Sequence, residues 1–347
     1  MKIIDSHMHI SKWDKSDFIS YFDSYRQKNG IHAVNICAIP LRQSNICNNI
    51  IAAFYKLARP NTYIHGGIEL IEIPIDNMPD DMDAVVQYRE LMEIGFDGIK
   101  MLEGKPTEHK RIGRNLNHPI LNKLYKELEK DGTHLLMHVN DPDEFWDEER
   151  APEWAIKSGW TYADGSFSSY KEVQNQTLTI LKEHPDLCLT LAHFFFCSKE
   201  PEILEELFSK YPNLCVDLTP GGEMYVEFEK NYDYYKEFFK KYSKRLIFGT
   251  DRSYMGDATY ADWLFNMVAA FIGTDKAVES FDHKTLKGLG LSRDKVDDIL
   301  FANFEARVGT KPKDIKKDKL KSYIEKYSFV LTDSDKENIK PLMEKYL

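Results

Sequence analysis

Short apolar segments alternate with longer segments of helical spacing along most of this 347-residue chain. The apolar segments predict strands at residues 3–9, 33–40, 63–70, 98–102, 134–140, 188–196, 214–219 and 245–251. The intervening segments predict helices at residues 16–28, 48–57, 82–94, 119–130, 170–183, 201–210, 232–242, 260–273 and 292–308. Strands joined through helices run parallel, and eight such units close into a barrel. The pattern therefore predicts an α/β fold, a (β/α)8 TIM barrel.

Two segments depart from this alternation. Residues 141–169 form a long loop after the fifth strand that is rich in tryptophan, tyrosine and phenylalanine, and we interpret it as a lid or pocket wall. Residues 310–347 are lysine-rich, with helices predicted at 318–326 and 333–346. We expect a barrel over residues 1–309 and a C-terminal helical extension over 310–347, packed on the barrel or used to form a homodimer.

Charge and composition narrow the classes of partner. The formal net charge is −10, which argues against a nucleic-acid backbone or an anionic membrane as the main partner. The chain opens without a secretion signal, and no apolar run approaches the ~20 residues of a membrane span. The five cysteines form no C-x-x-C pair, as expected for reduced thiols. We therefore expect a cytoplasmic protein that acts on a small molecule.

Polar side chains gather at the predicted ends of four strands. His7 and His9 end the first strand, His138 and His193 lie near the ends of the fifth and sixth, and Asp251 ends the eighth. Residues i and i+2 of a strand share a face, so His7 and His9 can direct two imidazoles at one point. Taken singly, each histidine can be a core residue bonded to a carbonyl, and the aspartate can cap a helix. Together at one rim of a barrel, they predict a metal site.

This arrangement resembles the amidohydrolase superfamily, in particular the amidohydrolase-2 branch that contains aminocarboxymuconate semialdehyde decarboxylase. The resemblance runs from residue 1 to the segment ILFANFEARVG at 299–309. It implies that His7, His9 and His138 ligate a divalent metal and that Asp251 is both a ligand and the acid/base. It implies that His193 either ligates a second metal or contacts the metal-bound water or the substrate. Zinc is the expected ion, with one ion favoured over two.

The resemblance implies a hydrolase that uses a metal-activated water on an amide, lactone or ester, with a carboxylate on the substrate. The alternative is a non-oxidative decarboxylase, a lyase acting on an aromatic or muconate-type acid at the same site. A metal-binding barrel without catalysis is a further reading, against which the intact Asp251 argues.

Further residues are candidates for substrate contact. Lys100 ends the fourth strand, where some superfamily members carry a carbamoylated lysine that bridges two metals. We favour a substrate-binding or structural ammonium there. Trp146 on the aromatic loop and Arg252 after the eighth strand are also predicted substrate contacts. Lys105 and Trp160 are candidates by position alone, whereas His65 is expected to be a core histidine.

Overall fold

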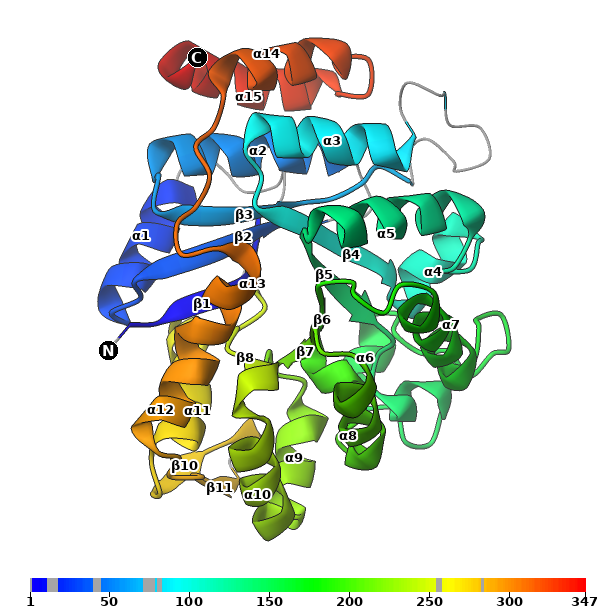
Figure 1. The fold of residues 1–347 in the computed structure, drawn as a ribbon, viewed down its shortest axis with the longest axis vertical. Coiled ribbons are helices and arrows are strands. Elements are labelled where there is room, and N and C mark those ends of the chain that lie inside the picture. The colour runs from blue at the N-terminus through cyan, green and yellow to red at the C-terminus, as the bar shows by residue number, and fades with distance from the viewer. Residues whose placement is uncertain are drawn as a thin grey trace.

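The computed structural model describes residues 2–10, 18–39, 45–70, 79, 83–253, 258–281 and 284–347. Within them the main sheet has the order β8-β7-β6-β5-β4-β3-β2-β1-β9, and every neighbouring pair is parallel (Figure 1). Its strands are β1 (Ile4–Ile10), β2 (Ala33–Ala38), β3 (Thr62–Gly66), β4 (Gly98–Gly104), β5 (His134–Val139), β6 (Leu189–Leu191), β7 (Leu214–Asp217), β8 (Leu246–Ile247) and β9 (Arg252–Ser253). The predicted parallel TIM-barrel sheet is confirmed.

The barrel closes because the predicted eighth strand is two short strands in sequence. Its first part, β8, pairs with β7, and its second part, β9, pairs with β1. Between them, the carbonyl of Phe248 accepts the backbone N–H of Ser6 at 3.2 Å. The buried carboxylate of Asp5 adds a second link, since it accepts the Thr250 hydroxyl at 2.7 Å and the Tyr25 hydroxyl at 2.9 Å. One side chain of β1 therefore fixes the segment between β8 and β9, which carries Asp251.

Helices surround the sheet, and their ends follow local sequence signals. Asp83 caps α3 by accepting the N–H of Val86 at 2.8 Å, and Ser169 with Glu172 forms a capping box at α7. The helices are α1 (Phe18–Lys28), α2 (Asn45–Ala58), α3 (Ala84–Ile94), α4 (Pro106–Ile112), α5 (Pro119–Asp131), α7 (Tyr170–Glu183), α8 (Pro201–Lys210), α9 (Gly222–Lys230), α10 (Tyr232–Tyr242), α11 (Ala258–Gly273), α12 (Arg293–Asp297) and α13 (Asn303–Val308). A π-helical turn, η7 (Asp298–Ala302), joins α12 to α13, so the predicted helix at 292–308 has three parts.

Other boundaries differ from the prediction. The sixth strand ends at Leu191 because the chain turns into η4 (His193–Phe196). The sequence did not predict α4, α9 or the small antiparallel pair β10 (Ala277–Glu279) and β11 (Thr285–Lys287). The predicted start of the first helix, at residue 16, lies outside the described residues.

The aromatic loop is ordered around its own small core. It contains η3 (Asp143–Trp146) and α6 (Glu153–Lys157), and Phe145, Ala155 and Tyr162 pack together at its centre. Asp141, at the start of the loop, ties the loop to itself and to the barrel: it accepts the Tyr162 hydroxyl, and Lys105, which follows β4, donates to the same carboxylate at 2.6 Å.

The tail forms α14 (Lys317–Lys326) and α15 (Asp333–Tyr346), which lie over α2 and α3 (Figure 1). Asn49 donates to the Tyr323 hydroxyl at 3.2 Å, and Lys326 donates to Glu90 at 2.7 Å. The connection to the tail runs so close to the end of α3 that a side chain at Gly95 would collide with the carbonyl of Asp314. Among the described helices, none combines the length and apolar character that crossing a membrane requires.

Candidate metal centre

His7 and His9 lie on β1, a strand that is buried along its whole length. As their spacing predicts, the two imidazoles meet, with 3.1 Å between their Nε2 atoms. The Nδ1–H of His7 donates to Asp217 at 2.8 Å, which leaves the Nε2 lone pair directed at His9. Burial, with a smaller contribution from Lys100, lowers the pKa of His7 to about 4, so its imidazole is neutral at physiological pH.

Asp251 reaches the same point from between β8 and β9. Its Oδ1 lies 2.8 Å from His9 Nε2 and 3.5 Å from His7 Nε2. Its backbone has φ 55°, a left-handed conformation that is rare for residues other than glycine, and its N–H donates to the carbonyl of His7 at 2.7 Å. Gly249 permits this approach, since a Cβ there would lie 2.9 Å from that of His7. Although burial opposes ionisation, the hydrogen bond with His9 and the nearby histidines hold the pKa of Asp251 well below its ordinary value.

His193 and His138 form a second imidazole pair beside the first. His138 Nε2 lies 2.7 Å from the carbonyl of Asn140, and His193 Nδ1 lies 3.2 Å from the carbonyl of Thr219. Each of these nitrogens donates, so His138 Nδ1 and His193 Nε2 face each other at 3.1 Å with lone pairs. His193 Nε2 is also 3.9 Å from Asp251 Oδ2.

A left-handed turn positions His193. Four successive residues without glycine, His193–Phe196, have φ between 51° and 57°. Each such residue costs roughly 1 kcal/mol or more relative to a right-handed one. Strain of this kind persists where the surrounding structure holds it in place. Here the carboxylate of Asp217 accepts the N–H of His193 at 2.8 Å and the N–H of Thr219 at 3.1 Å.

The donor set fits a divalent cation. One ligand atom from each of His7, His9 and Asp251 lies within 4.8 Å of the other two. His7 Nε2 and His9 Nε2 face each other at 3.1 Å, as do His138 Nδ1 and His193 Nε2, and imidazole nitrogens gathered in this way are suitable ligands for a cation. Of the five predicted ligands, His7, His9 and Asp251 have ligand atoms close together. His193 lies between this group and His138, since its Nε2 is 3.9 Å from Asp251 Oδ2 and 3.1 Å from His138 Nδ1.

Lys100 lies beneath this group, on β4. Its side chain is fully buried, and its Nζ is 3.1 Å from His7 Nε2. Burial lowers the pKa of its ammonium. The structure thus places Lys100 against the imidazole of His7.

A cavity of about 660 Å³ opens above the imidazoles, at the carboxyl ends of the strands. Its floor includes His138, His193 and Asp251, and aromatic residues of the loop and of α11 form part of its wall. The lining described includes Lys105 and Trp160 but none of Lys100, Trp146 and Arg252.

The other two predicted substrate contacts are engaged within the protein. The Trp146 indole N–H donates to the carbonyl of Ser168 at 3.0 Å, and its ring packs on Tyr162. The Arg252 guanidinium lies over the ring of Tyr260, 5.1 Å from its centre. For both, the placement favours support of the cavity wall over direct contact, and the assignment stays a prediction.

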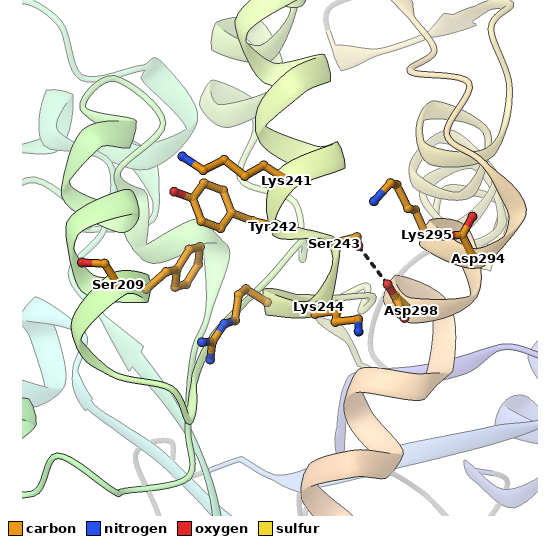
Figure 2. Close-up of a pocket in the computed structure, with 10 residues that line it drawn as sticks. Ser209, Lys241, Tyr242, Ser243, Lys244, Asp294, Lys295 and Asp298 are labelled. Carbon is orange, nitrogen blue, oxygen red and sulfur yellow. Dashed lines mark hydrogen bonds between the residues drawn. The ribbon is translucent and has the colours of Figure 1, made fainter.

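A second cavity, of about 350 Å³, lies at the opposite end of the barrel (Figure 2). Lys244 and Arg245, which line it, immediately precede β8, so it opens at the amino end of that strand. Ser243 and Asp298 are hydrogen-bonded across it at 2.8 Å. Active sites of this barrel type lie at the carboxyl ends of the strands, so we assign no catalytic role to this cavity.

Sequence reasoning missed the carboxylates around the ligands. Asp217 accepts hydrogen bonds from His7, His193 and Thr219, and these interactions lower its pKa despite complete burial. Asp141 pairs with Lys105 and lies 3.4 Å from His138 Nε2. The available signal was a charged residue within or directly after an apolar strand, which requires a buried partner.

Comparison with solved structures places the chain among TIM barrels. The chain shares 13% identity and a TM-score of 0.57 with a provisionally assigned amidohydrolase from Staphylococcus aureus, over 89% of this chain and 100% of the other. For IDCase of Metarhizium anisopliae in its apo form the values are 12% and 0.54, over 88% and 97%. For an uncharacterised TIM-barrel protein of Bordetella bronchiseptica they are 16% and 0.52, over 89% and 100%. No protein-family model matches the chain, and no curated protein matches it in sequence.

Proposed function

We propose that this protein is a metal-dependent hydrolase of the amidohydrolase superfamily, which cleaves a small amide, lactone or ester carrying a carboxylate. The observation that carries the proposal is the convergence of His7, His9 and Asp251 on one point, where Asp251 also lines a cavity. The TIM-barrel fold, shared with a provisionally assigned amidohydrolase, supports it. Zinc suits the imidazole-rich donor set, with one ion as the expected number.

His7, His9 and Asp251 would hold the ion, with His193 and His138 beside them. When bound, such an ion lowers the pKa of a water toward ~7 and polarises a substrate carbonyl. Asp251 faces the cavity with about a third of its side chain exposed, 35%, whereas His7 is completely buried. Asp251 is therefore the group placed to accept a proton from the attacking water and to deliver it to the leaving atom.

Asp217 and Thr219 act one step further from substrate. Asp217 fixes the Nδ1–H tautomer of His7, and Thr219 holds the ring of His193 through its carbonyl. These contacts keep the reactive nitrogens pointed at the centre before substrate arrives, which reduces reorganisation during turnover.

A decarboxylase at the same site is the second candidate. The observation that favours it is the aromatic wall of the cavity, with Trp154, Trp160 and Phe196, which suits a planar unsaturated acid. Loss of carbon dioxide would leave a carbanion that takes its proton from water, with Asp251 placed to accept that proton from the water and pass it on.

Product analysis separates these reactions. Protein purified without chelator is expected to contain about one divalent ion per chain. It is then assayed in heavy-oxygen water against lactones, aryl esters, amides and aromatic acids. Incorporation of label into a product acid supports the hydrolase, and release of carbon dioxide without label supports the lyase. A metal-free protein that binds no added zinc would refute both.

A further inference from the structure

Glu223 lies on the first turn of α9, directly after Gly221 and Gly222, and lines the cavity that holds His193 and Asp251. The residue as a whole is only partly buried, but its Oε1 is shielded from solvent. Within the part of the chain that the structure describes, that oxygen has no hydrogen-bond partner. Leaving a buried polar atom unpaired is unfavourable, so such an atom in a cavity marks a place for a ligand.

The backbone before Glu223 makes room for this carboxyl group. A Cβ added to Gly221 would collide with both of its oxygens. A Cβ added to Gly222 would meet the Phe281 ring at 3.4 Å. The Pro-Gly-Gly sequence that follows β7 therefore lets the acid fold back against the chain at the cavity wall, close to Phe281.

The charges around Glu223 disfavour its carboxylate form. Burial is the largest influence, and the neighbouring carboxylates of Glu144 and Asp141 add to it, which raises the pKa of Glu223 to about 8. Lys199 opposes this rise, but its ammonium is shared with Glu144, at 2.9 Å, and with Asp143. A backbone hydrogen bond of Glu223 also opposes the rise. Tyr170 and Tyr225 lie near enough to sense Glu223, and burial raises the pKa of both phenols.

We propose that Glu223 is a specificity-determining residue that donates a hydrogen bond from a neutral carboxylic acid to an oxygen of the substrate. The inference rests on the proposed function, because it takes the cavity over Asp251 as the substrate site. The cavity walls provide faces for a planar ring, from Trp160, Phe196, Tyr260 and Phe281. The substrate class is therefore a planar unsaturated or aromatic compound whose carboxylate or carbonyl oxygen accepts from Glu223. A carboxylic acid can supply this hydrogen bond where an ionised carboxylate would repel the substrate.

The first test needs no substrate. Infrared difference spectra compare the wild-type protein as purified with Glu223→Gln at about pH 7, where a group of pKa about 8 is mostly protonated. We expect the carbonyl stretch of one protonated acid to be lost in the variant and to fade in the wild type as the pH rises above that value. The matched control is Glu227→Gln, one turn along the same helix, where the glutamate pairs with Lys230 at 2.6 Å. The control retains the band.

The second test measures the hydrogen bond with benzoate as the probe, by calorimetry on the zinc-loaded protein. At about pH 7 we expect Glu223→Gln to bind within about threefold of the wild type, because an amide N–H still donates, and Glu223→Ala to bind at least about tenfold more weakly. Between about pH 7 and about pH 9 the wild type loses about tenfold in affinity as the acid ionises, whereas Glu223→Gln stays flat.

Three results overturn the inference: a carbonyl band that survives in Glu223→Gln, a benzoate affinity that Glu223→Ala leaves unchanged, or no benzoate binding at all. Failure of the proposed function is distinguishable from these, because it appears in the wild type as absent zinc or absent turnover. The infrared band of Glu223 requires neither bound zinc nor turnover.

Discussion

The barrel contains two groups of buried histidines that differ in how their nitrogens are satisfied. In the barrel interior, His65 Nδ1 pairs with the Asn35 amide oxygen at 2.7 Å, and His65 Nε2 pairs with His134 Nδ1 at 2.7 Å. His134 Nε2 ends the chain on the Thr190 hydroxyl at 2.8 Å. At the barrel mouth, by contrast, outer partners hold His7, His138 and His193 so that their remaining lone pairs converge.

This difference teaches how to tell a core histidine from a ligand. A linear chain of donors and acceptors uses every proton it has, and it needs no ion. The nitrogens that converge at the mouth have the Asp251 carboxylate and the Lys100 amine beside them, and a cation can bind the nitrogens and the carboxylate at once. Both groups are buried, so burial alone does not separate them, and neither does the pKa of one member of each: the pKa values of His134 and His138 are each lowered by burial to about 3.

The largest expected effect comes from the carboxylate at the mouth. We expect Asp251→Asn to retain most of its zinc and to lose about 10²–10⁴-fold in turnover of the substrate that product analysis identifies, because the amide accepts no proton. Thr190→Val, which cuts the interior chain, serves as the control and leaves turnover within about threefold. Normal turnover by Asp251→Asn would remove this residue from the mechanism.

The next largest effect comes from replacing one histidine of each group by glutamine and comparing zinc binding and stability. We expect His9→Gln to lower zinc affinity by at least about a hundredfold, because removing a ligand weakens binding more than removing a residue that hydrogen-bonds to a ligand. His65→Gln keeps its zinc and loses about 1–3 kcal/mol of unfolding free energy, because Asn35 and His134 each lose a partner. Metal analysis and urea unfolding measure both. Equal zinc content in the two variants would erase the distinction between the groups.

A third comparison changes the side chain whose oxygen pairs with the Nδ1 of a histidine, Asp217 beside His7 and Asn35 beside His65. Asp217→Asn is expected to weaken zinc binding by about 10–100-fold, since it disturbs the tautomer and basicity of His7. Asn35→Asp, at the corresponding position beside His65, leaves zinc affinity within about threefold. Competition with a chelating dye measures both affinities, and an unchanged affinity in Asp217→Asn would show that His7 needs no such support.

The smallest effect concerns acid stability. The pKa of His134 is about 3 in the folded protein and near the ordinary 6.5 when unfolded, so only the unfolded chain takes up this proton between those values. The contribution of neutral His134 to the unfolding free energy is fully present above about pH 6.5 and declines as the pH falls toward about 3. We expect His134→Gln to reduce the slope of unfolding free energy in that window by up to about 1.4 kcal/mol per pH unit. An unchanged slope in urea unfolding would contradict the folded pKa of His134.

Much of the fold was predictable from sequence, and so was the convergence of His7, His9 and Asp251 on one point. The helix bounds at α7, α8, α10 and α15 match the predictions, because caps, proline and apolar spacing are local signals. The convergence at the mouth follows from one rule, that the carboxyl ends of parallel strands share a rim.

The remaining features depend on contacts between distant segments. The left-handed turn at His193–Phe196 contains no glycine, so its sequence does not predict it. Asp217, 24 residues later, stabilises the turn by accepting the His193 N–H. Trp146 and Trp160 look alike in sequence, yet only the latter lines the described cavity, because Ser168 and Tyr162 engage the former. Glu223 lies on α9, a helix that the apolar pattern did not predict.

Anomalous diffraction at the zinc edge, from crystals of protein purified without chelator and supplied with zinc, tests the central claim most directly. The account predicts one peak within bonding distance, roughly 2.0–2.2 Å, of His7 Nε2, His9 Nε2 and an Asp251 oxygen. No peak there, or a peak against His65 and His134 instead, would contradict it.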